Sequence, residues 1–309
     1  MTHGIVNLLK PPGLTSHDSV QQVRTMLGER RVGHAGTLDP GATGVLVVCV
    51  GEATKAVPFM EEHEKEYWGE AVLGWATFTQ DAEGVVVERA PVGWETSVGA
   101  IAAAAAGLTG ELEQAVPLVS AVHVGGRRLY ALARRGAAME RPVRRVVVSR
   151  FVIHEVLPNG EGRLGPGARL RFSVTCSRGT YIRALVDDLG RALGGLAHLE
   201  FLVRCRSGPF RLEEAWTLEE LAQEANPARY LCPVERGLSY PALYLTPEEA
   251  VRFRYGAIGK GRPEPAGRKL VYRVGPGGAE PPAFLGVGEV DQAGRLRPLR
   301  LFGAGEERL

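Results

Sequence analysis

One carboxylate stands out for its setting. Asp39 lies in the stretch GHAGTLDPGATGVLVV (residues 33–48), which holds four glycines and one proline before an apolar run. Glycine allows backbone turns that other residues cannot make, and Pro40 biases Asp39 towards an extended conformation. Such a loop can hold one acid in a fixed place for nucleophilic chemistry. An Asp-Pro-Gly sequence also forms ordinary turns in which the aspartate caps its own backbone, so both interpretations stay open here.

A second segment is rich in arginine. Seven arginines and no lysine lie between Arg127 and Arg145, with Glu140 as the one acid among them. The net charge of +2 is too small to indicate a nucleic-acid partner by itself. The run is either a solvated surface or a phosphate-binding face, and the planar guanidinium, which binds phosphate through paired hydrogen bonds and stacks on bases, favours the second.

Length and composition limit the class of protein. The chain has 309 residues, of which 45% are hydrophobic, enough for one large domain and a small second one. No apolar stretch approaches the roughly 18–20 residues that cross a bilayer, and the first residues lack the layout of a signal peptide. We therefore expect a cytoplasmic protein. The four cysteines form no CxxC pair and the seven histidines have no metal-binding spacing, so we expect no disulfide, metal or cofactor.

The elements that must position Asp39 come from local patterns. Residues 5–9 predict a strand, followed by a helix that Ser16 or Asp18 caps and that ends near Gly28. Residues 45–50 predict a buried strand after the Asp39 loop. Farther on, the patterns predict strands at 67–73, 146–153 and 170–176, a helix at 101–106, a loop at 114–120, and a helix from Ile182 with Tyr181 and Arg183 in its first turn.

The composition changes after Leu238. Residues 256–283 are dense in glycine and proline, and two apolar runs within 284–302 flank Asp291-Gln292-Ala293-Gly294, which is typical of a hairpin. We predict two domains, residues 1–238 and residues 239–309, the second small and β-rich.

Ordered blocks over about two thirds of the chain resemble the TruB family of tRNA pseudouridine synthases. They are the Asp39 stretch with GEATK (51–55), LGWATFTQDAEG (73–84), SAVHVGGRRLYALARRG (120–136), CSRGTYIR (176–183) and residues 195–210. The resemblance implies an α+β fold around a mixed, mainly antiparallel sheet, flanked by helices and loops, with a C-terminal PUA-like RNA-binding domain. It also implies isomerisation of the uridine at position 55, in the T arm of tRNA, by a monomer without cofactor.

The same resemblance assigns roles to single residues. Asp39 becomes the covalent catalyst, attacking either the sugar C1′ or the base C6, and Arg183 its positive partner, which orients the carboxylate through paired hydrogen bonds. Tyr67 would stack on the uracil and Tyr181 would lie close to the base, where it could handle the C5 proton. Core filling is the alternative for both tyrosines.

Two further residues belong to the target nucleotide's surroundings. The uridine must be extruded from a folded loop, and the resemblance places His34 against the RNA where the base has left, with a structural imidazole as the alternative. Leu202 falls where the family packs an apolar residue under the target base.

The chain departs from the family pattern at three positions that concern RNA. His123 replaces the usual lysine, Val203 an arginine and Cys205 a threonine, while Arg204 keeps a positive charge beside them. These changes affect the expected RNA contacts more than the chemistry. The candidate RNA contacts are Arg127, Arg128, Arg134, Arg204 and His123.

Two other classes of function stay open. A glycoside or nucleoside hydrolase also attacks an anomeric carbon with a carboxylate but usually needs a second one, for which Asp81 is the candidate. A non-catalytic tRNA-binding chaperone would use the arginines and the C-terminal domain without Asp39. Free uracil as product would indicate hydrolysis, whereas a change of uridine to pseudouridine at constant mass would exclude it.

We predict that RNA binding by this chain weakens as the pH rises past the pKa of His123, because only the imidazolium attracts phosphate. Titration of RNA affinity against pH checks this. The matched variant His123→Lys should lose that pH dependence. An unchanged pH profile in the variant would contradict a role of His123 in RNA binding.

Overall fold

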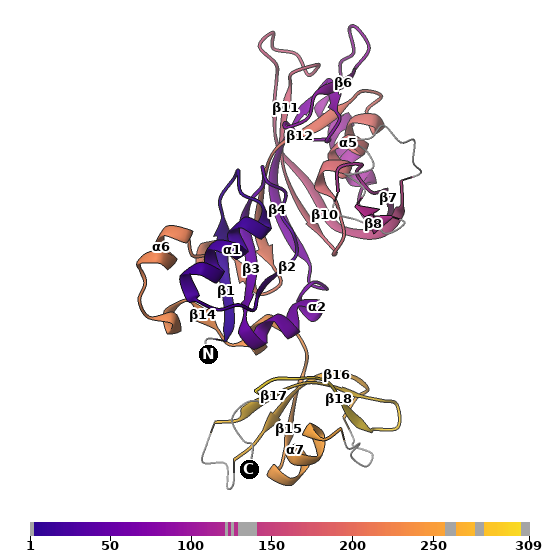
Figure 1. Ribbon diagram of the computed structural model, residues 1–309. Helices are drawn as coiled ribbons and strands as arrows, with labels where there is room; N and C mark the ends of the chain where they lie inside the picture. Colours follow the sequence, from indigo (N-terminus) through magenta and orange to yellow (C-terminus); the bar gives the residue numbers. More distant parts are fainter. Residues whose placement is uncertain are drawn as a thin grey trace.

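The computed structural model describes residues 3–120, 123–124, 127–128, 141–256, 264–275 and 281–303. Its main feature is a ten-stranded sheet that runs through the middle and the top of the molecule in the view of Figure 1. The strand order is β14-β1-β3-β12-β4-β11-β10-β7, with β2 beside β3 and β13 beside β12. All its pairings are antiparallel except that of β12 with β3. The predicted mixed, mainly antiparallel α+β fold is confirmed.

The strands of this sheet are long where the sequence is rich in β-branched and aromatic residues. They are β1 (Gly4–Lys10), β2 (Val32–Ala35), β3 (Thr43–Val50), β4 (Lys65–Leu73), β7 (Gly110–Ala115), β10 (Val143–Leu157), β11 (Arg169–Cys176), β12 (Ala197–Ser207), β13 (Phe210–Arg211) and β14 (Leu231–Cys232). Two short pairs lie apart from it, β5 (Trp75–Thr77) with β6 (Val86–Arg89) and β8 (His123–Val124) with β9 (Arg127–Arg128). The predicted 114–120 loop is shorter than expected, because Gln114 and Ala115 pair with β10.

Helices pack against the large sheet in two separate hydrophobic cores. Helices α3 (Val98–Gly107) and α5 (Ile182–Ala192) pack with β4, β10, β11 and β12 around Phe172 and Leu185. Helices α1 (Ser16–Leu27) and α6 (Leu218–Gln223) pack on β1 and β3 around Leu8 and Leu46. The remaining short elements are η1 (Gly51–Ala56), α2 (Val57–Met60), η2 (Leu212–Glu214), η3 (Pro227–Arg229) and η4 (Val234–Gly237).

The ends of α1 show how local sequence sets an element. The side chain of Thr15 accepts a hydrogen bond from the Asp18 backbone, and the Asp18 carboxylate accepts one from the Thr15 backbone at 3.0 Å. This reciprocal capping satisfies two otherwise free amides. The prediction that Ser16 or Asp18 is the cap was therefore wrong, because Thr15 is the cap and Asp18 completes the box. Gly28, in the left-handed conformation, ends the helix as predicted.

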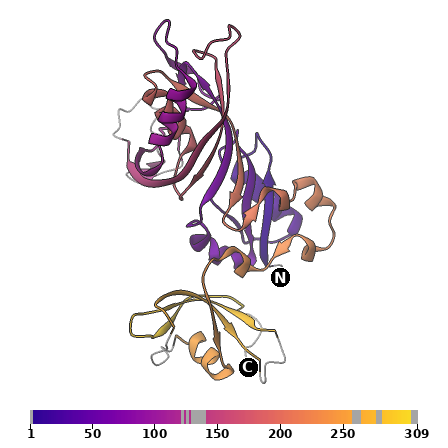
Figure 2. The same ribbon diagram turned by 180° about the vertical axis from the view of Figure 1, so that it is seen from behind.

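The C-terminal part forms its own four-stranded sheet in the order β15-β16-β17-β18, with α7 packed against it (Figures 1 and 2). The elements are β15 (Ala242–Leu245), α7 (Pro247–Arg254), β16 (Gly267–Arg273), β17 (Ala283–Val290) and β18 (Leu296–Leu301). The predicted hairpin around Asp291 is the β17–β18 pair. The sequence did not predict β16, which lies within the stretch 256–283 that is dense in glycine and proline.

The two parts share a hydrophobic core. Leu270, Val287 and Phe302 of the C-terminal sheet belong to the same buried cluster as Ile5 and Phe210 of the large sheet. Arg268 adds an ion pair to Glu62 at 2.6 Å and lies over the ring of Phe59. The C-terminal sheet is thus packed against the α2 side of the molecule. Among the described residues, no helix is long and apolar enough to cross a membrane.

We predict that Gly44→Ala destabilises the fold by at least about 2 kcal/mol. Gly44 has a φ of +107°, and a Cβ there would meet the Arg204 carbonyl oxygen at 2.3 Å, where β3 and β12 approach. Denaturant unfolding measures the change. Gly33→Ala is the matched control, because its Cβ would meet only Thr54 Cγ2 at 4.0 Å, and it should shift stability by less than about 1 kcal/mol. Equal effects of the two changes would contradict the argument.

Candidate active site

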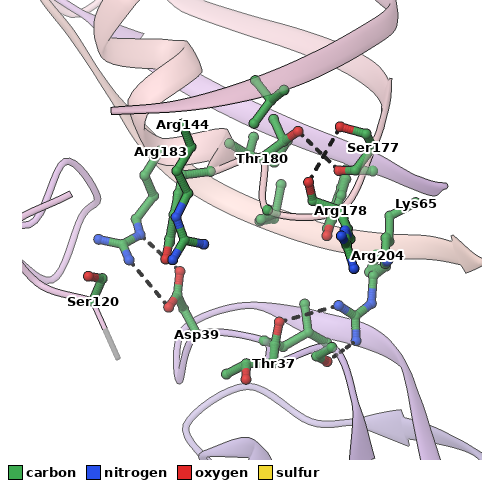
Figure 3. A pocket seen from close by; sticks show the side chains of 18 of the residues that line it. Thr37, Asp39, Lys65, Ser120, Arg144, Ser177, Arg178, Thr180, Arg183 and Arg204 are labelled. Atoms are coloured by element: carbon green, nitrogen blue, oxygen red, sulfur yellow. Dashed lines mark hydrogen bonds and ion pairs between the residues drawn. The ribbon is translucent and has the colours of Figure 1, made fainter. Parts of the chain in front are cut away.

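A cavity of about 740 Å³ opens beside the Asp39 loop. Its walls come from that loop, from β4, β10 and β12, and from the segment that joins β11 to α5 (Figure 3). This volume is typical of pockets that hold a small molecule or a single extruded nucleotide. The lining residues are Gly36, Thr37, Leu38, Asp39, Glu61, Lys65, Tyr67, Ser120, Arg144, Arg145, Val146, Ser177, Arg178, Gly179, Thr180, Tyr181, Ile182, Arg183, Leu202 and Arg204.

Asp39 and Arg183 meet at this cavity as a two-point ion pair. Arg183 Nε donates to Asp39 Oδ2 at 2.9 Å, and Nη2 donates to Asp39 Oδ1 at 3.3 Å (Figure 3). The arginine side chain is 4% exposed, whereas that of Asp39 is 44% exposed. The guanidinium is therefore fixed in the protein, and the carboxylate is oriented but open to the cavity. This is the geometry that a nucleophilic carboxylate requires.

Two further N–H groups of Arg183 are also used. Nη1 donates to the Thr79 carbonyl at 2.6 Å, and Nη2 donates to the Val119 carbonyl at 3.1 Å. A buried guanidinium is stable only when its donors are paired in this way. Arg183 stands in the first turn of α5, as predicted, while Tyr181 lies just before it as the capping residue.

Hydrogen bonds from the Lys10 side chain hold the backbone around the Asp39 loop. Its ammonium, which is 0% exposed, donates to the carbonyls of Pro11 at 2.9 Å, Leu14 at 2.5 Å and Pro40 at 3.1 Å. Burial lowers the pKa of Lys10 to about 8, although the nearby Asp39 charge opposes the shift. Ser16 adds a bond from its hydroxyl to the Leu38 carbonyl at 3.0 Å. The loop is thus anchored on both sides of Asp39.

Arg204 occupies a different place from the one expected. Its side chain is 1% exposed and donates to the carbonyls of Val45 at 2.7 Å, Gly36 at 2.9 Å and Thr37 at 3.3 Å. A surface contact with RNA does not fit this burial. The geometry instead gives Arg204 the task of holding the glycine-rich loop on β12 and β3.

Tyr67 and Leu202 form apolar parts of the cavity wall. Tyr67 is 8% exposed and Leu202 7% exposed, and both belong to the core of the large sheet. Burial raises the pKa of the Tyr67 hydroxyl, and the charge of Arg204, its partner across β4 and β12, acts against this. Tyr67 is therefore a neutral aromatic surface at the cavity. Tyr67 fills the core and also lines the cavity, so core filling is confirmed and base stacking stays a prediction.

Tyr181 lines the cavity with its backbone fixed. Its N–H donates to Gln114 Oε1 at 2.8 Å, and its carbonyl accepts from Gln114 Nε2 at 3.1 Å. The side chain is half-buried. Tyr181 and Arg183, from one motif, thus come together with Asp39, Tyr67 and Leu202 from distant parts of the chain.

His34 is not part of the cavity wall. It lies on β2, and its Nδ1 is buried without a hydrogen-bond partner among the described residues. Burial, and then the charge of Arg204, lower its pKa. Of the other expected RNA contacts, Arg134 lies outside the described residues, and for His123, Arg127 and Arg128 the structure describes only the backbone pairing of β8 with β9.

Asp81 contacts the arginine rather than the cavity. Its Oδ2 lies 3.6 Å from Arg183 Nε, and Oδ1 accepts from the Thr79 hydroxyl and from the Glu83 N–H at 3.1 Å. Apart from Arg183, its partners belong to the turn at residues 77–84. Asp81 therefore approaches the same Nε of Arg183 that Asp39 pairs with, at a longer distance.

The sequence motifs did not single out three cations of the cavity. Lys65 is 5% exposed and donates to the carbonyls of Glu61 at 2.6 Å and His63 at 2.5 Å. Arg144 and Arg178 are exposed at the cavity's edge (Figure 3). Arg144 belongs to the arginine-rich run and Arg178 to CSRGTYIR, so the signals were present, but only the fold shows that they face Asp39.

Solved structures with this fold define the class. The chain superposes on a chain of a Cbf5–Nop10–Gar1 complex with a TM-score of 0.67 and 25% identity, covering 94% of this chain and 79% of that one. It superposes on a chain of an archaeal box H/ACA sRNP Nop10–Cbf5 complex with a TM-score of 0.67 and 23% identity, covering 97% and 85%. The chain therefore shares the fold of these proteins, and the match of residues 24–182 to a pseudouridylate synthase family makes its class that of the pseudouridine synthases.

Sequence comparisons narrow the class further. Residues 24–182 match the model of the TruB family pseudouridylate synthase N-terminal domain, residues 183–239 that of the tRNA pseudouridylate synthase B C-terminal domain, and residues 241–302 that of the pseudouridine synthase II TruB C-terminal region. The tRNA pseudouridine synthase B of Moorella thermoacetica is 46% identical over 254 residues, 82% of this chain and 81% of that protein. The Symbiobacterium thermophilum protein of the same name is 47% identical, with 82% of each chain covered. The chain belongs to the TruB family, as its motifs predicted.

We predict that RNA affinity has an alkaline limit set by Lys65. Burial lowers the pKa of Lys65 to about 8, so its positive charge is present below that pH and is lost as the pH rises through it. In an Asp39→Asn background, chosen so that the proposed turnover does not interfere, the Kd for RNA should rise about threefold between pH 7 and pH 9, because the buried wall of the cavity loses a positive charge near the bound phosphates. Lys10 shifts similarly but is 0% exposed and does not line the cavity.

Two further variants make this measurement specific. Lys65→Met should bind more weakly at pH 7 and show no step near pH 8, whereas Lys65→Arg should keep its affinity to pH 9. A step of unchanged size in Lys65→Met would assign it to another group.

Proposed function

We propose that this chain converts the uridine at position 55 in the T arm of tRNA to pseudouridine, with Asp39 as the covalent catalyst. The observation that carries the proposal is the two-point pairing of Asp39 with the buried Arg183 at a cavity walled by Tyr67 and Leu202. Relatives named tRNA pseudouridine synthase B, at 46% and 47% identity, support tRNA as the substrate.

The reaction consumes nothing. The bond between N1 and C1′ breaks, the uracil turns, a bond forms between C5 and C1′, and the proton that C5 loses is balanced by the one that N1 gains. Asp39 acts by attack on either C1′ or C6. Arg183 keeps the two oxygens of Asp39 aimed at the cavity, and no further cofactor is required by this balance.

The target base must leave the folded T loop before it can reach Asp39. Tyr67 offers a buried ring on which the flipped uracil stacks, and Leu202 packs against its other side. In this proposal Tyr181, at the start of α5, handles the C5 proton. His34, on β2 outside the cavity, occupies the gap in the RNA that the flipped base leaves.

Basic side chains at the cavity would hold the RNA backbone. Arg144 and Arg178 are exposed at its edge and Lys65 is buried in its wall. Phosphates are bound by basic groups with little sequence preference. Arg127, Arg128, Arg134 and His123 are the further candidates from the sequence. We propose residues 239–309 as a PUA-like RNA-binding domain, on the strength of the four-stranded sheet and the family match over residues 241–302. As a monomeric tRNA-modifying enzyme it would act in the cytoplasm.

The hydrolase alternative has less support. A glycosidase needs a second carboxylate that faces the substrate, whereas Asp81 is turned to Arg183, Thr79 and Glu83. A chaperone without chemistry would not need an open carboxylate fixed by a buried arginine.

The proposal is tested by incubating the protein with unmodified tRNA and nothing else, then mapping pseudouridine. We expect pseudouridine at position 55 without release of uracil. Asp39→Asn, which keeps the size of the side chain and removes its charge, should abolish the reaction and still bind the tRNA. Free uracil would indicate the hydrolase, and full activity of Asp39→Asn would overturn the assignment of the catalyst.

A further inference from the structure

One polar group of the cavity has no assigned task. Ser120 lies in the loop that follows β7, lines the cavity and is 7% exposed. The residue before it is fixed, because the Val119 carbonyl accepts from Arg183 Nη2 at 3.1 Å. The same arginine thus orients Asp39 and holds the backbone beside Ser120, so the serine has a defined position relative to the carboxylate.

The Ser120 hydroxyl is buried and has no hydrogen-bond partner within the described part of the chain. Two other hydroxyls of the cavity wall are already used. Ser177 Oγ accepts from the Val147 N–H at 2.9 Å, and Thr180 Oγ1 donates to the Ser177 carbonyl at 3.0 Å. Leaving a buried hydroxyl unpaired costs about 1–3 kcal/mol. A group of this kind at the wall of a substrate cavity is expected to be satisfied by the substrate.

The position of Ser120 indicates which part of the nucleotide it meets. Figure 3 shows Ser120 on one side of Asp39, with Lys65 and Arg204 on the other. Tyr67, the proposed stacking surface for the base, follows Lys65 by two residues on β4. Its register partner on the neighbouring strand β12 is Arg204. The uracil therefore occupies the Lys65 side, and the ribose lies towards Ser120. The group beside C1′ that can both donate and accept a hydrogen bond is the 2′-hydroxyl, which distinguishes RNA from DNA.

We propose that Ser120 is a specificity-determining residue whose hydroxyl forms a hydrogen bond with the ribose 2′-hydroxyl of the target nucleotide. The inference rests on the proposed function and adds to it a contact that selects ribonucleotides.

The experiment is a double-mutant cycle on full-length protein. Wild type and Ser120→Ala are assayed for kcat/KM on two T-arm stem-loops that differ only in having uridine or 2′-deoxyuridine at the target position. We expect Ser120→Ala to lower kcat/KM on the uridine RNA about fivefold, the size of one neutral hydrogen bond. On the 2′-deoxyuridine RNA the same change should have almost no effect, so the coupling between the two deletions is also about fivefold.

Two measurements exclude a purely structural role. The melting temperature of Ser120→Ala should be no lower than that of wild type, because the change removes an unpaired buried hydroxyl and no internal hydrogen bond that the structure describes. Ser149→Ala is the matched control: its hydroxyl bonds to Glu64 at 3.0 Å and to the Thr175 carbonyl at 3.1 Å, outside the cavity wall. It should leave kcat/KM unchanged on both RNAs.

The outcomes separate this inference from the proposed function. No pseudouridine from wild type on the uridine RNA would overturn the function itself. If wild type is active and Ser120→Ala loses the same factor of kcat/KM on both RNAs, the contact with the 2′-hydroxyl is overturned. A lowered melting temperature with an unchanged kcat/KM would make Ser120 a structural residue and overturn the proposal as well.

Discussion

The pairing of Asp39 with a buried arginine is the interaction on which the site depends. Arg183 is 4% exposed, so its charge must be balanced and its donors used inside the protein. Its partners come from three separate segments, namely the Asp39 loop, the turn that carries Thr79, and the loop that carries Val119. Because one side chain is shared by all three, the cavity is assembled as a unit, and displacement of any segment alters the aim of the carboxylate.

The glycine-rich loop would not hold its shape by backbone preference alone. Lys10 and Arg204 are almost fully buried beneath it, and each uses its charge to bind main-chain carbonyls rather than acids. Charged donors form stronger hydrogen bonds than neutral ones. Two cations under the loop and one beside its carboxylate therefore give an open, flexible sequence a fixed form.

Much of the site could be predicted because its residues stand in continuous motifs. Asp39, Arg183, Tyr67, Tyr181 and Leu202 line the cavity together, and the strands follow the β-branched segments that predicted them. The assignments of RNA contact are different in kind. Arginines in a sequence all look suited to phosphate, but burial is set by tertiary packing, and only the pairing of β12 with β3 places Arg204 in the interior. Lys65 was missed for the same reason, since a lysine at the start of a strand gives no sign that it faces a cavity.

The short segment between α2 and β4 has a mechanical consequence. Glu62 forms an ion pair with Arg268 of the C-terminal sheet, while the carbonyls of its neighbours Glu61 and His63 accept from Lys65 in the cavity. Load applied to the C-terminal sheet therefore reaches the cavity through a few consecutive residues. Because the two sheets also share one hydrophobic core, a displacement of the C-terminal sheet is coupled to the position of the cavity wall.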